Sequence, residues 1–289
     1  MRNNAICFIV WTVSLLFTVQ VNALDNLNSQ ALDPFEDVYT PEVRNLDLVT
    51  RILFIGNSFS FYNNGIHNHL GSLIRSAGKW ETGQNRLRLS TLSGGHIYEQ
   101  LTDLNYYLSD PKQNWQGIVL QGHSNEPIHS KKKALFERAM EKAITLIKQK
   151  DIKPILFMTW GYKGQPKMST ELANAYIKIA NRYNVPVVPV GLAFAQAQSS
   201  LKNIELYVPD VLTVNNLGKA DASLKYRRDW KHPSEAGTYL AACVFYASLY
   251  GKSPEGLIFH GTLSAEDATA LQKLSWQVTR EFFNQRLVN

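Results

Sequence analysis

The stretch RILFIGNSFSFYNNG, residues 51–65, begins as an apolar run and changes abruptly to small and polar residues after Ile55. Its first six residues have the length of a strand, and their nearly unbroken hydrophobic character is typical of a strand covered on both faces of its sheet. Asn57 and Ser58 follow at the point where this strand would end. Both residue types are common in turns, so the stretch alone leaves open whether Ser58 turns the chain or reacts.

The same alternation continues along the chain. Strand-length segments occupy 51–56, 86–92, 117–122, 153–160 and 185–191. Helical patterns fill the intervals at 65–78, 96–109, 131–150 and 169–184, and two more follow at 233–251 and 264–287. In the segment 131–150, Leu135, Ala139, Ala143 and Ile147 recur at four-residue steps, which predicts one buried helix face. Alternating strands and helices predict an α/β fold, with a parallel sheet of about five strands and helices on both faces.

The N-terminal residues have the features of an export signal. Arg2 is followed by a mostly apolar run from Ala5 to Val19, and Ala23 ends a small-residue cleavage site. The run is shorter than the ~20 residues of a membrane-spanning helix, although an uncleaved anchor helix remains an alternative. We therefore predict a signal peptide over 1–23, an extended lead-in over 24–48 and one domain over 49–289. The protein would be periplasmic or secreted, without a stable membrane anchor.

The charge of the chain argues against one class of function, and its cysteine content excludes an internal disulfide in the domain. Lys and Arg total 30 against 24 Asp and Glu, a net charge of +6 that is spread along the chain. This small, scattered surplus argues against nucleic-acid binding, which requires a concentrated basic face. Cys243 is the one cysteine after the signal segment, so the domain cannot form an internal disulfide. Its apolar neighbours predict a core residue rather than a nucleophile, while the oligomeric state stays open.

Ser58 would need a base and a carboxylate to act as a nucleophile. The stretch RDWKHPSEAG provides both, because Asp229 and His232 lie three residues apart just before a predicted helix. Asp229 would orient the imidazole, and His232 would take the proton of Ser58. Asp229 as a loop cap and His232 as a surface residue are the alternative. Ser60 is a weaker candidate nucleophile, because it lies two residues further from the strand end.

Residues that could stabilise an oxyanion follow the next two predicted strands. Gly94 and Gly95 separate a strand from a helix, so backbone N–H groups could approach a ligand there. The stretch QGHSN, residues 121–125, places the side-chain amides of Gln121 and Asn125 after the third strand. Because ligands bind beyond the carboxyl ends of parallel strands, these groups would meet Ser58 at one edge of the sheet. A tight turn and a polar loop without a role are the alternatives.

Taken in order, these motifs resemble the SGNH (GDSL-like) hydrolase superfamily from about residue 51 to residue 251. FIGNSFSFYNNG and HPSEAGTYLAACVFYASLYG are most similar to an exported bacterial branch known chiefly as a domain of unknown function. The resemblance implies a three-layer, flavodoxin-like fold. It also implies that Ser58 is the nucleophile, that Asp229 and His232 complete the triad, and that Gly94 contributes a backbone N–H to the oxyanion hole beside that of Ser58.

The sequence departs from the family pattern at two places. Asn57 stands where the family usually has Asp before the serine, and QGHSNEP stands where Gly-x-Asn-Asp is usual. The second stretch resembles the Gln-Gly-Glu-Ser stretch of some carbohydrate acetylesterases. Either Gln121 or Asn125 could replace the missing amide, and we favour Gln121 because it is nearer the strand end.

The sequence therefore predicts a serine esterase that needs no metal or organic cofactor and acts on a small-molecule or glycan ester. Aromatic residues expected around the cleft, namely Tyr62, Trp160, Tyr162 and Trp230, favour an acetylated carbohydrate as the substrate. A general, lipase-like esterase and a non-catalytic carbohydrate-binding protein on the same fold are the alternatives. Nucleotide binding is disfavoured, because 56–65 lacks both the P-loop Lys-Ser/Thr and the dinucleotide glycine spacing. His67 and His69 would point to different faces of a helix, which disfavours a metal site.

Overall fold

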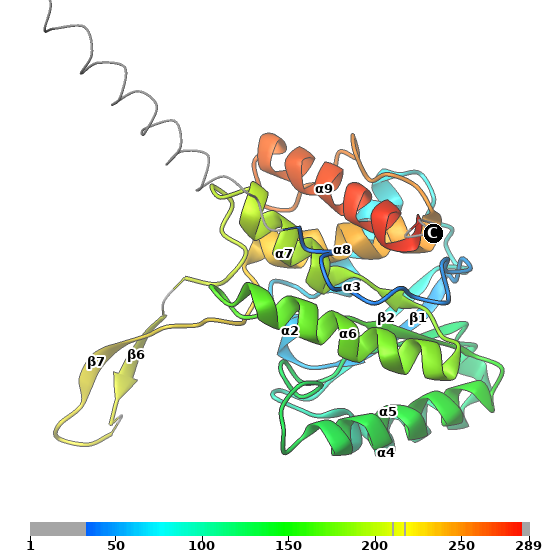
Figure 1. Ribbon diagram of the computed structural model, residues 1–289, viewed down its shortest axis with the longest axis horizontal. Coiled ribbons are helices and arrows are strands. Elements are labelled where there is room, and N and C mark those ends of the chain that lie inside the picture. Colours follow the sequence, from blue (N-terminus) through cyan, green and yellow to red (C-terminus); the bar gives the residue numbers. More distant parts are fainter. Residues whose placement is uncertain (1–32, 210, 217, 285–289) are drawn as a thin grey trace, which may run out of the picture. The chain divides into compact units, whose positions relative to one another are not determined.

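The computed structural model describes residues 33–209, 211–216 and 218–284 (Figure 1). The predicted signal peptide, residues 1–23, and the first part of the predicted lead-in lie outside these residues. Within the described part of the chain, no helix is both long enough and apolar enough to cross a membrane.

A parallel sheet of five strands in the order β2-β1-β3-β4-β5 forms the centre of the fold. Its strands are β1 (Arg51–Gly56), β2 (Arg86–Thr91), β3 (Gly117–Leu120), β4 (Lys153–Phe157) and β5 (Val187–Val188). Ile55 of β1 pairs with Ser90 of β2 on one side and with Leu120 of β3 on the other, so the three strands end at the same edge. The strand order reverses between β1 and β3, which is where such sheets bind ligands.

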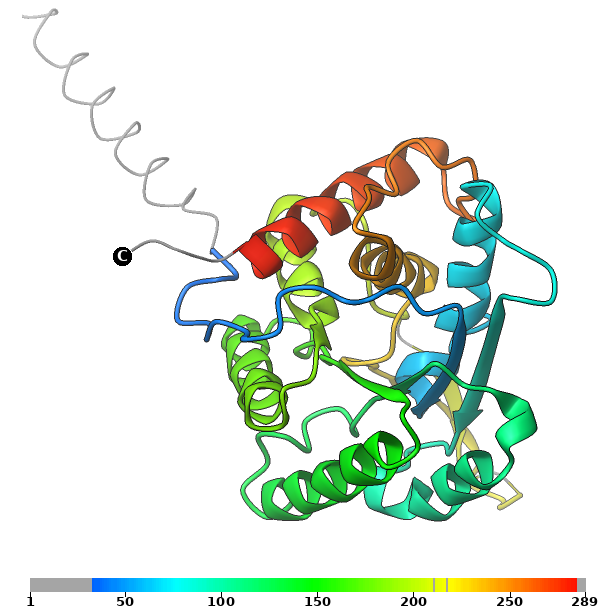
Figure 2. The ribbon, with the colours of Figure 1, turned by 90° about the vertical axis from the view of Figure 1, so that its right-hand side faces the viewer.

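Helices cover both faces of the sheet (Figure 2). On one face lie α3 (Ile66–Ser76), α7 (Val190–Ser200), α8 (Glu235–Tyr250) and α9 (Ala265–Asn284). On the other lie α4 (Leu101–Ser109), α5 (Lys133–Lys148) and α6 (Pro166–Tyr183). Short helices α2 (Ser58–Phe61), η1 (Ile97–Gln100) and η2 (Pro111–Gln113) occupy loops. The predicted α/β fold with helices on both faces is therefore confirmed.

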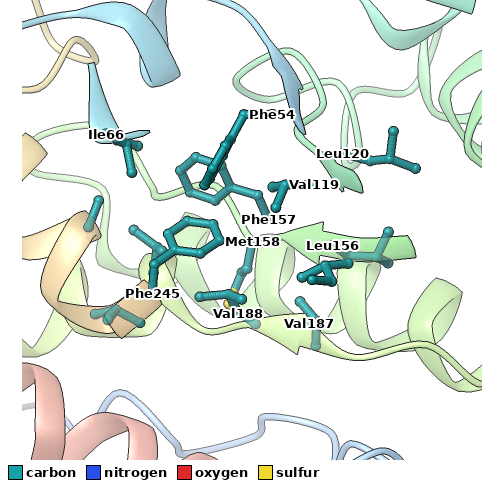
Figure 3. Close-up of a cluster of buried hydrophobic side chains, with 14 of the residues drawn as sticks. Phe54, Ile66, Val119, Leu120, Leu156, Phe157, Met158, Val187, Val188 and Phe245 are labelled. Atoms are coloured by element: carbon teal, nitrogen blue, oxygen red, sulfur yellow. The ribbon is translucent and has the colours of Figure 1, made fainter. Parts of the chain in front are cut away.

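The core is apolar and densely aromatic where α8 meets the sheet (Figure 3). Phe245 of α8 packs edge-to-face against Phe54 of β1 and against Phe157 of β4, with ring centroids 5.3 Å apart in each pair. Nearly every residue of α8 is buried, as its apolar sequence requires. Cys243 lies in this helix, and burial raises the pKa of its thiol, so it is a core residue without thiolate character at neutral pH.

The buried face predicted for the helix in 131–150, which is α5, was only partly right. Ala139, Ala143 and Ile147 of α5 are buried, whereas Leu135 is 38% exposed. The buried stripe instead begins at Phe136, which packs edge-to-face on Tyr176 of α6. The reason is geometric, because the 3.6-residue helical turn drifts away from a strict four-residue spacing.

The predicted strand 185–191 was too long. Only Val187 and Val188 pair with β4, and α7, which the sequence did not predict, begins at Val190. Pro186 and Pro189 lack N–H donors and so cannot extend the ladder. Gly191 then lets the helix approach the sheet, because a Cβ there would lie 2.2 Å from the carbonyl oxygen of Thr159. A continuous apolar run does not distinguish a buried strand from a buried helix.

Two irregular segments acquire definite structure. Residues 33–48 contain no helix or strand, and they are fixed to α6 by reciprocal hydrogen bonds. Asn174 Oδ1 accepts from the N–H of Tyr39 (2.7 Å), and its amide donates to the carbonyl of Asp37 (2.8 Å). In the segment 209–228, for which the sequence predicted no element, β6 (Val211–Asn215) and β7 (Ser223–Arg227) form an antiparallel pair.

Candidate active site

Ser58 lies at the carboxyl edge of the sheet, as the first residue of α2 directly after β1. Asn57 is the N-cap, and its side-chain oxygen accepts a hydrogen bond from the N–H of Phe59 (3.2 Å). This cap fixes the sharp change from strand to helix. Ser58 is 8% exposed, so its hydroxyl is sheltered and still borders a cavity.

Ser58, His232 and Asp229 form a continuous series of hydrogen bonds, although 174 positions separate the serine from the histidine. His232 Nε2 lies 2.9 Å from Ser58 Oγ, and His232 Nδ1 lies 2.6 Å from Asp229 Oδ2. Asp229 Oδ1 accepts the backbone N–H groups of Lys231 (3.1 Å) and His232 (2.9 Å). The tight turn that this creates places the His232 ring between Asp229 and Ser58, so His232 is not a free surface residue.

The carboxyl of Asp229 is held in its charged form. Burial raises its pKa, but the hydrogen bonds from the His232 backbone, the His232 ring and the Lys231 backbone outweigh burial and bring the pKa below its ordinary value. Asp229 is therefore an acceptor at neutral pH, and the proton on Nδ1 of His232 has a fixed partner. In that tautomer Nε2 is free to accept the proton of Ser58.

Aromatic rings hold the imidazole of His232 in place. Tyr62 stacks on it with ring centroids 4.5 Å apart and an angle of 3° between the planes, and Phe59 meets it edge-on at 6.0 Å. Trp160 was expected at the cleft rim, but it is fully buried between Phe59 and Phe194. Its indole N–H donates to the carbonyl of Lys231 (2.9 Å), so this core residue anchors the loop between Asp229 and His232.

A cavity of about 240 Å³ opens beside the Ser58 hydroxyl. Its wall contains residues from the loops after β1, β2 and β3 and from the loop before α8, namely Asn57, Ser58, Phe59, Phe61, Tyr62, Ser93, Gly94, His123, Ser124, Lys231 and His232. The predicted oxyanion residue Gly94 thus lines the same cavity as the nucleophile candidate. It has φ +65°, a conformation that glycine adopts without strain. Trp230 and Tyr162, both expected at the rim, are not among these residues.

The two amides predicted for the oxyanion hole do not reach this cavity. Gln121 is fully buried, and both of its N–H groups are used, one by Asn57 Oδ1 (2.8 Å) and one by the carbonyl of Gly122 (2.6 Å). Asn125 borders a different hollow, beside Tyr162 and α6. Gln121 stays outside the cavity because its backbone N–H bonds to the carbonyl of Ile55 (3.0 Å), which keeps the residue beside β1.

Ser60, the weaker nucleophile candidate, belongs to the same buried group. Its hydroxyl donates to Gln121 Oε1 (2.7 Å), and the residue is 1% exposed. It does not line the cavity with Ser58. The structure therefore leaves Ser58 as the hydroxyl that His232 contacts.

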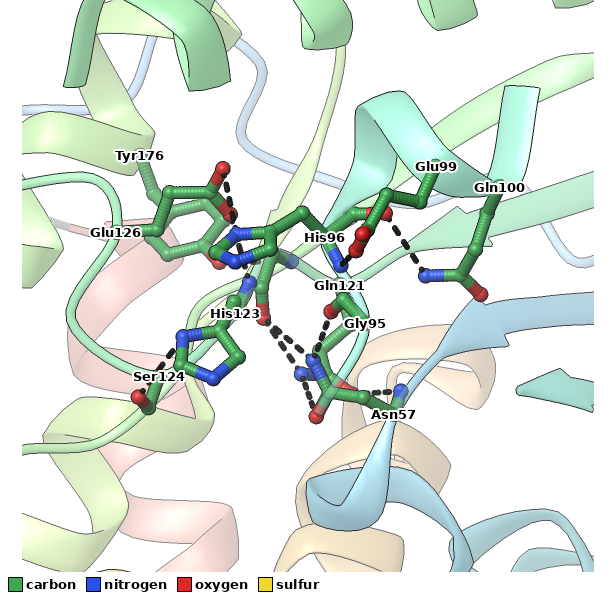
Figure 4. A network of polar contacts seen from close by, with 11 residues as sticks. Asn57, Gly95, His96, Glu99, Gln100, Gln121, His123, Ser124, Glu126 and Tyr176 are labelled. Carbon is green, nitrogen blue, oxygen red and sulfur yellow. Dashed lines mark hydrogen bonds and ion pairs between the residues drawn. The ribbon is translucent and has the colours of Figure 1, made fainter. Parts of the chain in front are cut away.

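Asn57 and Gln121 together lock the three loops that carry the site (Figure 4). The Asn57 amide donates to the carbonyl of Gly95 (3.0 Å), after β2, and to that of Gly122 (3.4 Å), after β3. Gln121 Oε1 accepts the N–H of Asn57 (3.1 Å). Asn57 and Gln121, which both depart from the family pattern, therefore bond to each other. The Asn57 amide can donate to the two carbonyls while its oxygen accepts from Gln121.

We expect Asn57→Asp to lower the free energy of unfolding at pH 7 by about 2 kcal/mol, because a carboxylate would face two carbonyl oxygens and lose both donors. Burial there would raise the folded-state pKa above the ordinary Asp value of about 3.9. The loss of stability therefore grows as pH rises from the unfolded pKa to the folded one, and it shrinks at pH 4, where the protonated acid can donate to Gly95. Urea unfolding at both pH values measures this.

Asn105→Asp, on the exposed face of α4, is the control for the added charge. It should leave stability within about 0.5 kcal/mol, as surface substitutions usually do. If Asn57→Asp were equally neutral at pH 7, the Asn57–Gln121 lock would not hold the loops as described.

A second polar group lies beside His123, which lines the cavity (Figure 4). Glu126 is fully buried, its Oε2 accepts the N–H of His123 (3.0 Å), and its Oε1 lies 3.0 Å from His96 Nδ1. The His96 and His123 rings pack with centroids 4.6 Å apart. Burial raises the pKa of Glu126, while hydrogen bonds to His123 and His96 oppose that rise. His96 and Glu126 could not be singled out from the sequence, because only the fold brings their loops together.

Comparison with known proteins agrees with this architecture. No family model and no curated protein matches the sequence. Among solved structures, a candidate SGNH hydrolase from Slackia heliotrinireducens is 23% identical, with a TM-score of 0.52, and the match covers 70% of this chain and 99% of that one.

Two further structures share the fold at lower identity. A DUF4886 family protein from Bacteroides uniformis is 16% identical, with a TM-score of 0.56, and the match covers 80% of this chain and 95% of that one. The acetyl xylan esterase AlAXEase is 17% identical, with a TM-score of 0.50, and the match covers 68% of this chain and 98% of that one. The chain therefore has the fold of the SGNH hydrolase superfamily, as the order of its motifs predicted.

Proposed function

We propose that this protein is a serine hydrolase that cleaves carboxylic esters through Ser58, His232 and Asp229. The observation that carries the proposal is the unbroken series of hydrogen bonds from Asp229 Oδ2 through the imidazole of His232 to Ser58 Oγ, at the wall of a cavity. This arrangement provides the nucleophile, the base and the orienting carboxylate of a catalytic triad. The fold supports it, because a candidate SGNH hydrolase and an acetyl xylan esterase share this architecture.

In the proposed reaction, His232 takes the hydroxyl proton while Ser58 Oγ forms a bond to the ester carbonyl carbon. The carbonyl electron pair moves onto oxygen, and the backbone N–H groups of Ser58 and Gly94 stabilise the resulting oxyanion. When the oxyanion collapses, His232 gives its proton to the departing alcohol and an acyl-serine remains. His232 then takes a proton from water as the water oxygen attacks the acyl-serine carbonyl. When this second oxyanion collapses, the bond to Ser58 Oγ breaks, His232 returns the proton to Oγ, and the acid is released.

We propose an acetylated carbohydrate as the substrate class. A cavity of about 240 Å³ is below the usual range of drug-sized pockets, which favours a short acyl group. Phe61 and Tyr62 line this cavity, and aromatic faces suit the apolar faces of sugar rings. One structure with this fold is named an acetyl xylan esterase, which is consistent with this assignment.

Acyl-chain length tests the substrate proposal. We expect kcat/KM for p-nitrophenyl acetate to exceed that for the octanoate ester by at least tenfold, because a cavity of about 240 Å³ leaves little room for a long acyl chain together with its alcohol. We also expect acetate release from acetylated xylan, measured by an enzyme-coupled acetate assay. Preference for octanoate, with no acetate released from any acetylated glycan, would replace this proposal by a lipase-like esterase.

A further inference from the structure

We propose that the neutral imidazole of His123 supplies the third hydrogen-bond donor of the oxyanion hole, through its Nε2–H. This inference rests on the proposed esterase function. The loop after β3 contributes His123 and Ser124 to the cavity wall. Both N–H groups of the Gln121 amide already have acceptors, and Asn125 lines another hollow. The sequence predicted a side-chain amide as the third oxyanion donor, and we assign this role instead to the ring N–H of His123.

The orientation of the ring leaves one nitrogen for the cavity. His123 Nδ1 lies 3.3 Å from Ser124 Oγ. A dashed line marks this contact in Figure 4. The two nitrogens of an imidazole point in different directions, so Nε2 is directed away from Ser124. Within the described residues, Nε2 has no hydrogen-bonding partner, and the residue shares the cavity wall with Ser58 and Gly94. A developing oxyanion would provide the missing acceptor.

A hydroxyl relay behind the ring can set the tautomer. Ser124 Oγ lies between His123 Nδ1 (3.3 Å) and the hydroxyl of Tyr162 (3.0 Å). When Tyr162 donates to Ser124 and Ser124 donates to Nδ1, the ring proton resides on Nε2. Negative charge on the substrate oxygen favours this direction of the relay, because it places the N–H dipole toward the charge.

The ring of His123 is neutral at pH 7. Burial and the nearby positive charges of His96, Lys231 and Lys132 lower the pKa of His123 to about 4, although Glu99 opposes them. A neutral imidazole can donate a hydrogen bond to an oxyanion without giving up its proton, as neutral histidine electrophiles do in other enzymes. His123 is therefore a neutral donor at pH 7.

The donor is also held rigidly. Glu126 Oε2 accepts the backbone N–H of His123, and the His96 ring packs against the face of the His123 ring. Oriented donors that need no reorganisation during the reaction are the ones that stabilise a transition state effectively. The buried Glu126–His96 group is thus a positioning element for His123.

The test compares three substitutions at position 123. His123→Ala should lower kcat for p-nitrophenyl acetate by about 10²- to 10³-fold with little change in KM, as removal of an oxyanion donor does. His123→Asn and His123→Gln, which restore a side-chain N–H, should each recover at least tenfold of that loss. Affinity for a boronic acid, which forms a tetrahedral adduct with the serine, should fall in parallel with kcat. His260→Ala, at an exposed histidine outside the cavity, is the matched control and should change nothing.

Several results would overturn the inference. One is a folded His123→Ala variant with wild-type kcat, and another is a kcat loss that Asn and Gln do not recover while boronic acid affinity is unchanged. If His123→Ala does not fold, His123→Phe keeps a ring against His96 without an N–H, and it should show the same loss. Ser58→Ala, assayed in parallel, separates the two proposals, because a wild type that hydrolyses no ester overturns both, whereas Ser58-dependent hydrolysis that ignores position 123 overturns only this one.

Discussion

Replacing Ser58 by alanine is expected to reduce ester hydrolysis by at least ~10⁴-fold while the protein stays folded. The substitution removes the atom that forms the acyl-enzyme, and loss of a triad nucleophile elsewhere costs up to ~10⁶ in kcat. The hydroxyl contributes little to stability, because its contact with His232 lies at the wall of a cavity rather than in the core. Steady-state hydrolysis of p-nitrophenyl acetate and a thermal unfolding curve measure the two effects separately.

Ser60→Ala is the matched control, two residues further along α2. It removes a hydroxyl that bonds to Gln121 and does not border the cavity. We expect about 1 kcal/mol of lost stability from the broken buried hydrogen bond, with most activity retained. The opposite ranking of the two variants would make Ser60 the nucleophile. A wild type that binds acetylated glycans without hydrolysing any ester would instead support the non-catalytic carbohydrate-binding alternative.

Asp229→Asn is expected to lower kcat by about 10⁴-fold, as the corresponding change does in serine proteases. The structure gives a specific reason for this loss. The N–H groups of Lys231 and His232 both donate to Oδ1, so an amide here must keep its oxygen on that side. Its NH₂ group would then face Nδ1 of His232 and force the ring proton onto Nε2. In that tautomer the ring has no lone pair for the Ser58 proton.

Asp47→Asn is the control for the loss of a carboxylate, because Asp47 pairs with Lys153 at an exposed position. It should leave kcat unchanged. With the same ester, Asp229→Asn should show the loss in kcat whether or not its KM changes. A decrease smaller than tenfold would mean that Asp229 does not set the tautomer of His232, which would contradict its role in the proposed triad.

The fold could be predicted because its strands carry an unambiguous pattern. The run 51–56 and its counterparts are apolar, short and separated by helical segments, and this combination has few structural solutions. The meeting of Ser58, Asp229 and His232 was also predictable, since each follows a recognisable boundary between elements. The strand predicted at 185–191 was too long, because the first residues of a buried helix are as apolar as a buried strand.

Side-chain direction at the ends of strands could not be predicted. Gln121 and His123 lie two residues apart after β3, yet one is turned under α2 and the other borders the cavity. The choice depends on Asn57, which offers Gln121 a complementary partner 64 positions away in the sequence. Trp160 was misplaced for a similar reason, because Phe59 and Phe194 enclose it. The signal peptide, export and the oligomeric state stay predictions or open questions.

Covalent labelling tests the proposed nucleophile most directly. The protein should be incubated with a fluorophosphonate, which phosphonylates activated serine hydroxyls, and the adduct should be located by peptide mass spectrometry. The account predicts one modified residue, Ser58, and no labelling when His232 is replaced by alanine. An adduct on another serine, or no adduct on a folded protein, would contradict it.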